Sequence, residues 1–147
     1  MRKINRIVVH CTGGTQNATV DSLKNHWRKI GWRNVGYHFV IAADGKVTQL
    51  ANLSQVTNGV RGFNSDSVHV AYFGGIDRQG KPIDNRTDAQ KKSITGVLRM
   101  LRGMLGNIPI VGHRDLSPDR DGDGVVERAE WVKACPCFDA KKEYDML

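Results

Sequence analysis

Short runs of β-branched residues alternate along this chain with two longer segments whose apolar residues recur at helical spacing. The strand-sized runs occupy residues 7–10, 37–43, 46–50, 67–73 and 108–111, and the helical segments occupy residues 19–30 and 87–105. Strands and amphipathic helices each have an apolar side to bury, so their alternation favours one central sheet with helices packed on it. The pattern therefore predicts an α/β fold, in which the alternating run 67–73 is a half-buried strand.

Local signals indicate where several of these elements begin and end. Thr87 is followed three residues later by Gln90, a capping-box pattern that predicts the start of the second helix. The apolar stripe of that helix consists of Ile94, Val97, Leu98, Leu101 and Leu105. The stripe of the first helix consists of Val20, Leu23, Trp27 and Ile30. The pair Asp44-Gly45 predicts a two-residue hairpin turn between the runs 37–43 and 46–50.

The length of 147 residues and the hydrophobic content of 39% suit one globular domain that covers residues 1–147. No apolar run approaches the length that a membrane-spanning helix needs. Only three consecutive apolar residues follow the basic start of the chain before His10, too few for the apolar region of a signal peptide. We therefore expect a protein made in the cytoplasm without an export signal, which would reach an external target only if something else releases it.

The net charge of +7 and the pI near 9.6 suit a polyanionic partner. The 22 lysines and arginines are scattered, however, with no run longer than two and no aromatic-basic motif of the nucleic-acid-binding type. We therefore expect no specific nucleic-acid partner. The three cysteines are an odd number, which does not suit a disulfide framework and favours thiols kept for a metal or for catalysis.

Histidines and cysteines that follow predicted strands or lie late in the chain form a candidate metal set. His10 and His113 each stand at the end of a predicted strand, and Cys135 and Cys137 lie together in a later segment. A catalytic zinc takes three protein ligands and keeps a fourth position for water or substrate. Two histidines and one cysteine, far apart in sequence, suit such an open site better than a zinc finger. On this pattern alone, Cys137 remains an alternative to Cys135.

The remaining candidates have more ordinary interpretations. Cys11 follows His10 on a strand, so its side chain would point to the opposite face and be buried as a small hydrophobic group. His26 is expected to face solvent on the first helix. His38 is expected to make hydrogen bonds in the core or behind the metal site, and His69 is the weakest alternative metal ligand.

Six short motifs, in order along the chain, resemble those of a known family. They are VVHCT at 8–12, GYHFVI at 36–41, DG at 44–45, GGID at 74–77, GHR at 112–114 and KACP at 133–136. Together they resemble the N-acetylmuramoyl-L-alanine amidases of the phage-lysozyme type, which are related to peptidoglycan recognition proteins. The resemblance covers nearly the whole chain. It implies a central mixed β-sheet flanked by helices, with zinc in a surface cleft.

The resemblance also implies roles for individual residues. The zinc ligands correspond to His10, His113 and Cys135, and the position of Cys137 usually holds a small residue such as serine in the family. Tyr37 and Lys133 correspond to the catalytic tyrosine and lysine. The ammonium group of Lys133 would lie beside the oxyanion of the intermediate. The Tyr37 hydroxyl would hydrogen-bond the attacking water or the oxyanion, or help a proton reach the leaving amine.

The implied reaction is zinc-dependent hydrolysis of the amide bond between N-acetylmuramic acid and the first L-alanine of the stem peptide. Bacterial peptidoglycan is then the partner, which would also account for the basic charge, and the protein is expected to act as a monomer. The alternative is a module that recognises peptidoglycan without cutting it; such relatives commonly lack the zinc cysteine. The missing export signal favours a phage or prophage lysis enzyme, with a cytoplasmic enzyme that recycles wall fragments as the other interpretation.

A second ion site is predicted at residues 119–130, where the sequence DRDGDGVVERAE matches the EF-hand loop pattern D-x-[DN]-x-[DN]-G-x5-E. The expected calcium ligands are the carboxylates of Asp119, Asp121, Asp123 and Glu130 and the backbone carbonyl of Val125. Pro118 precedes the loop, so a full entering helix and a paired EF-hand are not expected, whereas residues 130–133 are expected to be helical. We expect a structural Ca²⁺ that shapes the catalytic loop.

Overall fold

The computed structural model describes residues 1–147 and is built around one five-stranded sheet. The strands are β1 (Arg6–Cys11), β2 (Phe39–Ile41), β3 (Val47–Gln49), β4 (Ser67–Tyr72) and β5 (Ile110–Gly112). The helices are α1 (Val20–Lys29), α2 (Asp88–Leu105) and α3 (Ala140–Glu143), with short 3-10 helices η1 (Asn64–Asp66), η2 (His113–Leu116) and η3 (Arg128–Glu130). None of the helices combines the length and apolar character needed to cross a bilayer.

The sheet is mixed and has the strand order β3-β2-β4-β1-β5. β1 pairs in parallel with β4 and β5, β2 pairs in parallel with β4, and only the β2–β3 hairpin is antiparallel. The hairpin turns through Asp44-Gly45 as predicted, with Gly45 at a φ of 89°, where a residue without a Cβ has no steric cost. The loop is longer than the two residues predicted, because Ala42 N–H still bonds to the Lys46 carbonyl and residues 43–45 lie between them. The α/β fold with a mixed central sheet is therefore confirmed.

One prediction about the sheet is wrong. The run 67–73 was expected to be half-buried, but all six residues of β4 are buried. β4 lies between β1 and β2, so both of its edges are hydrogen-bonded to other strands. Its side chains also pack on both faces of the sheet: Val70 and Tyr72 lie in the main core, and Ala71 packs on the other face. A strand that is covered on both faces has mostly apolar residues at consecutive positions. The polar residue His69 makes β4 look like the alternating pattern of a half-buried strand.

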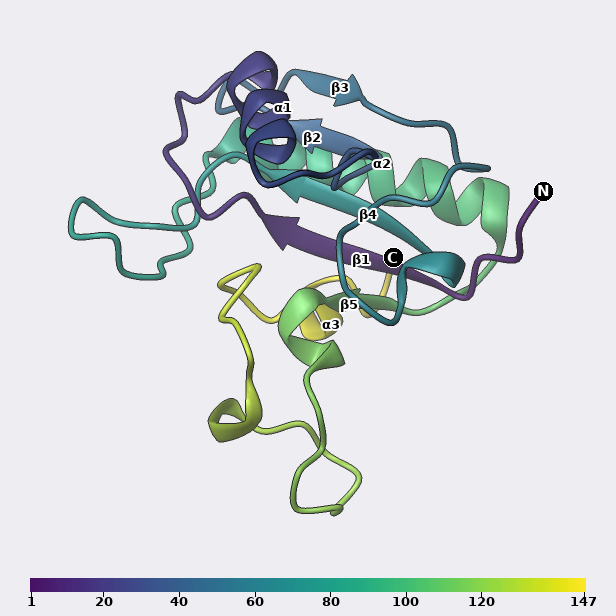
Figure 1. Cartoon of the computed structure of the whole chain (residues 1–147). Helices are drawn as coiled ribbons and strands as arrows, with labels where there is room; N and C mark the ends of the chain where they lie inside the picture. The colour runs from purple at the N-terminus through teal and green to yellow at the C-terminus, as the bar shows by residue number, and fades with distance from the viewer.

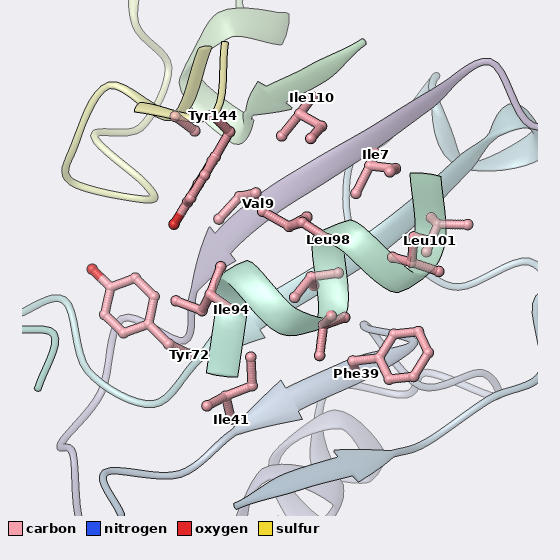
Figure 2. Close-up of a cluster of buried hydrophobic side chains, with 14 of the residues drawn as sticks. Ile7, Val9, Phe39, Ile41, Tyr72, Ile94, Leu98, Leu101, Ile110 and Tyr144 are labelled. Atoms are coloured by element: carbon pink, nitrogen blue, oxygen red, sulfur yellow. The ribbon is translucent and has the colours of Figure 1, made fainter. Parts of the chain in front are cut away.

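α2 covers one face of the sheet (Figures 1 and 2). Its predicted capping box is present, with Thr87 and Gln90 each accepting a backbone N–H of the other. The stripe residues Ile94, Val97, Leu98 and Leu101 are buried, whereas Leu105 is only partly so. They pack on the strand side chains Ile7, Val9, Phe39, Ile41, Val70 and Tyr72, which form the main core. This face is therefore mostly apolar, with Gln90 of α2 as a buried polar exception that donates to the Ile41 and Phe73 carbonyls.

α1 lies on the opposite face and covers only part of it (Figure 1). Val20 and Leu23 pack there on Val40, Ala71 and Phe73. Ile30, the last residue of the predicted stripe, lies beyond the helix end and is exposed. The rest of this face combines a small apolar cluster of Val8, Val60 and Val111 with buried polar side chains, among them His10, His38 and His69. The open half of this face is where a site can form.

The segment between β5 and α3 leaves the sheet as a long excursion that carries η2 and η3 (Figure 1). The helix predicted for residues 130–133 is not present: the short helix η3 ends at Glu130, and residues 131–133 are irregular. After this excursion, the C-terminal segment that carries Phe138 and α3 packs against Arg86. Its guanidinium contacts Glu143 at 2.6 Å and Asp84 at 2.9 Å and lies 3.3 Å from the centre of the Phe138 ring.

Candidate metal centre

Strand register brings His10 and His113 together. Val9 on β1 pairs with Gly112, the last residue of β5, so His10 on β1 and His113 at the start of η2 directly follow a pair of neighbouring residues. Their rings lie 4.9 Å apart, centre to centre. The third predicted ligand, Cys135, is held beside them because its carbonyl accepts the Arg114 N–H at 2.8 Å. One ligand atom from each of the three residues lies within 4.8 Å of the others.

The donor set and its spacing fit a zinc ion. Cys135 Sγ lies 3.8 Å from His10 Nδ1, and a tetrahedral zinc holds a nitrogen and a thiolate sulphur about 3.5 Å apart. Sγ also accepts the Cys11 backbone N–H at 3.2 Å, which fixes its position beside His10. Two imidazoles and one thiolate are a ligand set that catalytic zinc adopts in proteins. The structure thus contains a zinc-type His/His/Cys site.

The site opens into a cavity of about 160 Å³ whose lining includes Tyr37, His113, Lys133 and Cys135. The Tyr37 ring lies 5.1 Å from the His10 ring, and its hydroxyl donates to the Cys11 carbonyl at 3.4 Å. Lys133 is exposed at the rim. The structure therefore places both residues that were predicted to be catalytic at the mouth of the predicted metal site.

Burial sets the protonation of the groups around the cavity. Burial and then the charge of Lys133 lower the pKa of His113 to about 4. Burial and then the neighbouring His69 hold the pKa of His10 well below its usual value. Both imidazoles are therefore neutral at physiological pH, the form that binds metals. Burial also raises the pKa of Tyr37, so its side chain remains a phenol that can donate a hydrogen bond.

A groove of about 470 Å³ continues from this cavity, with Trp32, Asn58, Gly59, His113 and Lys133 shared by both. Its other walls include the apolar side chains Val60, Phe63, Leu116 and Val132 and the exposed Arg61. The combined cleft therefore extends beyond the cavity at the metal site. Apart from His113 and Lys133, none of these lining residues was singled out from the sequence, because they come from segments that only the fold brings together.

The structure separates the two late cysteines. Cys137 Sγ donates to the Gly75 carbonyl at 3.4 Å and lies 3.9 Å from Cys11 Sγ, so it faces away from the histidines. Cys11 is buried on the α2 side of the sheet, as predicted. His26 is exposed and His38 is fully buried, where its Nε2 contacts the Gln55 carbonyl at 2.8 Å.

His69 has a closer relation to the site than the sequence indicated. It was considered only as a weak alternative metal ligand, and it does not join the His/His/Cys group. Instead, its Nδ1 lies 2.8 Å from His10 Nε2. The contact depends on the pairing of His10 with Ala71 and of Val8 with His69 across β1 and β4, which no local pattern reveals.

The four carboxylates of the predicted calcium loop also gather. An oxygen from each of Asp119, Asp121, Asp123 and Glu130 lies within 4.8 Å of the others. Asp119 accepts the Gly124 N–H at 2.7 Å, and Asp123 accepts the Val125 N–H at 2.9 Å. Glu130 is buried, unlike the three aspartates.

Comparison with known proteins agrees with this geometry. The family model described as N-acetylmuramoyl-L-alanine amidase matches residues 1–136. The endolysin of Enterobacteria phage K11 is 34% identical over 143 residues, which cover 96% of this chain and 85% of that protein. The solved amidase LysC of Clostridium intestinale has the same fold, with a TM-score of 0.74, 22% identity and coverage of 97% and 83%. Drosophila peptidoglycan recognition protein SA also has this fold, with a TM-score of 0.71, 16% identity and coverage of 100% and 80%. The chain therefore belongs to the N-acetylmuramoyl-L-alanine amidase family.

Proposed function

We propose that this protein hydrolyses the amide bond between N-acetylmuramic acid and L-alanine in bacterial peptidoglycan, with zinc held by His10, His113 and Cys135. The observation that carries the proposal is the His/His/Cys group at the base of a cleft, with Tyr37 and Lys133 at its mouth. The match of residues 1–136 to the amidase family supports the substrate. Its relatives among the endolysins support a role in phage or prophage lysis of the cell wall.

Amide hydrolysis needs an activated water and stabilisation of the oxyanion that forms on the carbonyl. The chemistry that bound zinc supplies is a pKa of about 7 for coordinated water and polarisation of the carbonyl. Lys133 contributes a positive charge beside the oxyanion. Tyr37, held as a phenol, donates a hydrogen bond to the oxyanion and helps deliver a proton to the leaving amine.

The reaction is tested by digesting purified peptidoglycan and analysing the products by mass spectrometry. Free stem peptides that begin with L-alanine should appear without new reducing sugar ends. The His113→Ala variant, which lacks one zinc ligand, is the matched control and should release none. New reducing ends without new alanine amines would instead indicate a glycosidase. Binding of peptidoglycan without any cleavage would indicate a recognition module.

We also propose that the loop 119–130 binds a structural Ca²⁺. The support is the complete match to the EF-hand loop pattern and the convergence of its four carboxylates. Val125 is expected to supply its backbone carbonyl as a fifth ligand. The hard oxygen ligands prefer calcium, and the His/Cys group prefers zinc, so the two ions would not compete for the same site.

Thermal melting of the zinc-loaded protein tests the calcium proposal. The melting temperature should rise with added calcium, because an ion that binds only the folded chain stabilises it. Asp119→Asn and Glu130→Gln should abolish that rise, while Asp139→Asn, outside the loop, should keep it. If the melting temperature does not change with calcium and elemental analysis finds no bound calcium, the loop is only an acidic turn.

A further inference from the structure

Behind the metal site, two histidines form a hydrogen bond that is closed off from solvent. His10 Nε2 lies 2.8 Å from His69 Nδ1, and the exposed fractions of the two residues are 1% and 0%. His10 Nδ1, on the other side of the ring, is the atom that faces Cys135 Sγ. Since a neutral imidazole has one N–H and one lone pair, the direction of this hydrogen bond decides which His10 nitrogen can bind a metal.

Asn64 fixes that direction. Its Oδ1 accepts the backbone N–H of Val60 at 2.7 Å, and a backbone N–H can only donate, so this atom is identified as the amide oxygen. The same oxygen lies 2.9 Å from His69 Nε2. An oxygen cannot donate here, so His69 Nε2 must carry the hydrogen.

The remaining assignments follow in sequence. Full burial without a carboxylate partner keeps His69 neutral, so a hydrogen on Nε2 leaves a lone pair on Nδ1. That lone pair accepts a hydrogen from His10 Nε2. His10 is then left with its lone pair on Nδ1, directed toward Cys135 Sγ.

We propose that His69 and Asn64 are positioning residues that hold the His10 ring with Nε2–H toward His69 and Nδ1 toward the metal. The inference rests on the proposed zinc site but concerns residues outside it. A metal-bound imidazole whose other nitrogen donates to a fixed acceptor is oriented before the metal arrives and becomes a stronger ligand. The chain from Val60 N–H through Asn64 and His69 to His10 supplies such an acceptor from η1 and β4.

Two substitutions at His69 separate this role from simple packing. Asparagine can place its Oδ1 where Nδ1 stood and still accept from His10, whereas leucine fills similar space without an acceptor. His69→Leu should weaken zinc binding by about 10- to 100-fold, measured by competition with a chromogenic chelator. His69→Asn should stay within about threefold of the wild type, because the acceptor is restored.

The matched control is His38→Leu. His38 is equally buried on the same face, and its ring contacts Arg2, Thr57 and the Gln55 carbonyl. It also accepts the backbone N–H of His69, but it takes no part in the hydrogen bond between the His69 and His10 rings. If the zinc loss in His69→Leu came from general loosening of this face, His38→Leu should lose as much. We expect it to retain zinc affinity within about threefold. Melting of each variant without metal identifies any that fails to fold.

A second readout uses the metal-free protein, so it does not depend on zinc binding or activity. Nitrogen-15 NMR should show a proton on His10 Nε2, slow to exchange with water, and a coupling across the hydrogen bond to His69 Nδ1. Both signals should disappear in His69→Leu and not in His38→Leu. A proton on His69 Nδ1, or equal zinc affinity in the wild type and in His69→Leu, would overturn the inference. Failure of the wild-type protein to bind zinc would instead overturn the proposed zinc site, while the NMR result would still decide the hydrogen bond.

Discussion

Tyr37 and Lys133 line the same cavity as two of the proposed zinc ligands, but neither belongs to the ligand group. The Tyr37 side chain contacts the neighbouring His10 ring, and its hydroxyl donates a hydrogen bond to the Cys11 carbonyl. Lys133 stands two residues before Cys135 and reaches the cavity from the rim. Chemistry and metal binding should therefore be separable by single substitutions.

The first prediction at this scale is that Tyr37→Phe and Lys133→Ala each keep one zinc per chain and lose activity by about 10²- to 10³-fold. That is the usual cost of removing one group that stabilises the transition state. Zinc is measured by elemental analysis and the rate by release of stem peptides. Lys46→Ala, an exposed lysine on the β2–β3 turn, is the control and should behave as the wild type. Parallel loss of zinc and rate would show that the two side chains support the site instead of the reaction.

The second prediction concerns the two late cysteines. Cys135→Ser should lose the bound zinc, because a serine hydroxyl does not replace a thiolate ligand. Cys137→Ser should retain it, since Cys137 Sγ bonds to the Gly75 carbonyl on the far side of the loop. The zinc content of both purified variants checks this. The reverse pattern would identify Cys137 as the ligand.

At the scale of single elements, α2 supplies most of the apolar contact on its face of the sheet (Figure 2). Leu98 is fully buried at the middle of the helix, whereas Met104 on the same helix is 64% exposed. Leu98→Ala should therefore lower the free energy of unfolding by about 2–5 kcal/mol, from lost burial and the cavity left behind. Met104→Ala should change it by less than about 0.5 kcal/mol. Urea unfolding with zinc present compares the two; equal effects would contradict the assigned core.

The elements that sequence patterns predicted well are those whose signals are local. The capping box at Thr87 and the turn at Asp44-Gly45 depend on residues within a few positions, and both form at the predicted places. The burial of β4 depends on the strands beside it, and the His10–His69 contact depends on register between β1 and β4. Such information arises only when distant segments pair. The family motifs named three ligand candidates that the fold brings together, but they could not reveal the contact between His10 and His69.

At the scale of the whole molecule, Arg86 ties the segment before α2 to the last helix. Its guanidinium side chain is 2% exposed and is shared between Asp84 and Glu143, while the Phe138 ring covers it. Hydrogen bonds from Arg86 lower the pKa of the Glu143 carboxyl below its usual 4.5. A carboxyl with a lowered pKa in the folded state stabilises that state above pH 4.5, and the contribution is lost as the pH falls through the folded-state value.

We therefore expect the wild-type protein to melt at a higher temperature than Glu143→Gln at neutral pH. The difference in melting temperature should shrink as the pH falls from about 6 to about 3. Over that range the Glu143 carboxyl of the wild type becomes protonated, whereas the glutamine of the variant does not titrate. Thermal melting across this range, at fixed zinc, measures the difference. A constant difference across the range would show that the ion pair contributes no pH-dependent stability.

The order in which the three proposed ligands occur along the chain has a consequence for biosynthesis. His10 and Cys135 are 125 positions apart, and His113 lies between them. A ribosome makes the chain from its N-terminus, so His10 emerges long before its two partners. β5, which carries His113 to its place, must also add to the edge of β1 before the group can close. A nascent chain therefore has His10 in place without the other two proposed ligands for most of its synthesis. The proposed hydrolase should stay inactive during its own translation, until Cys135 has joined the assembled sheet.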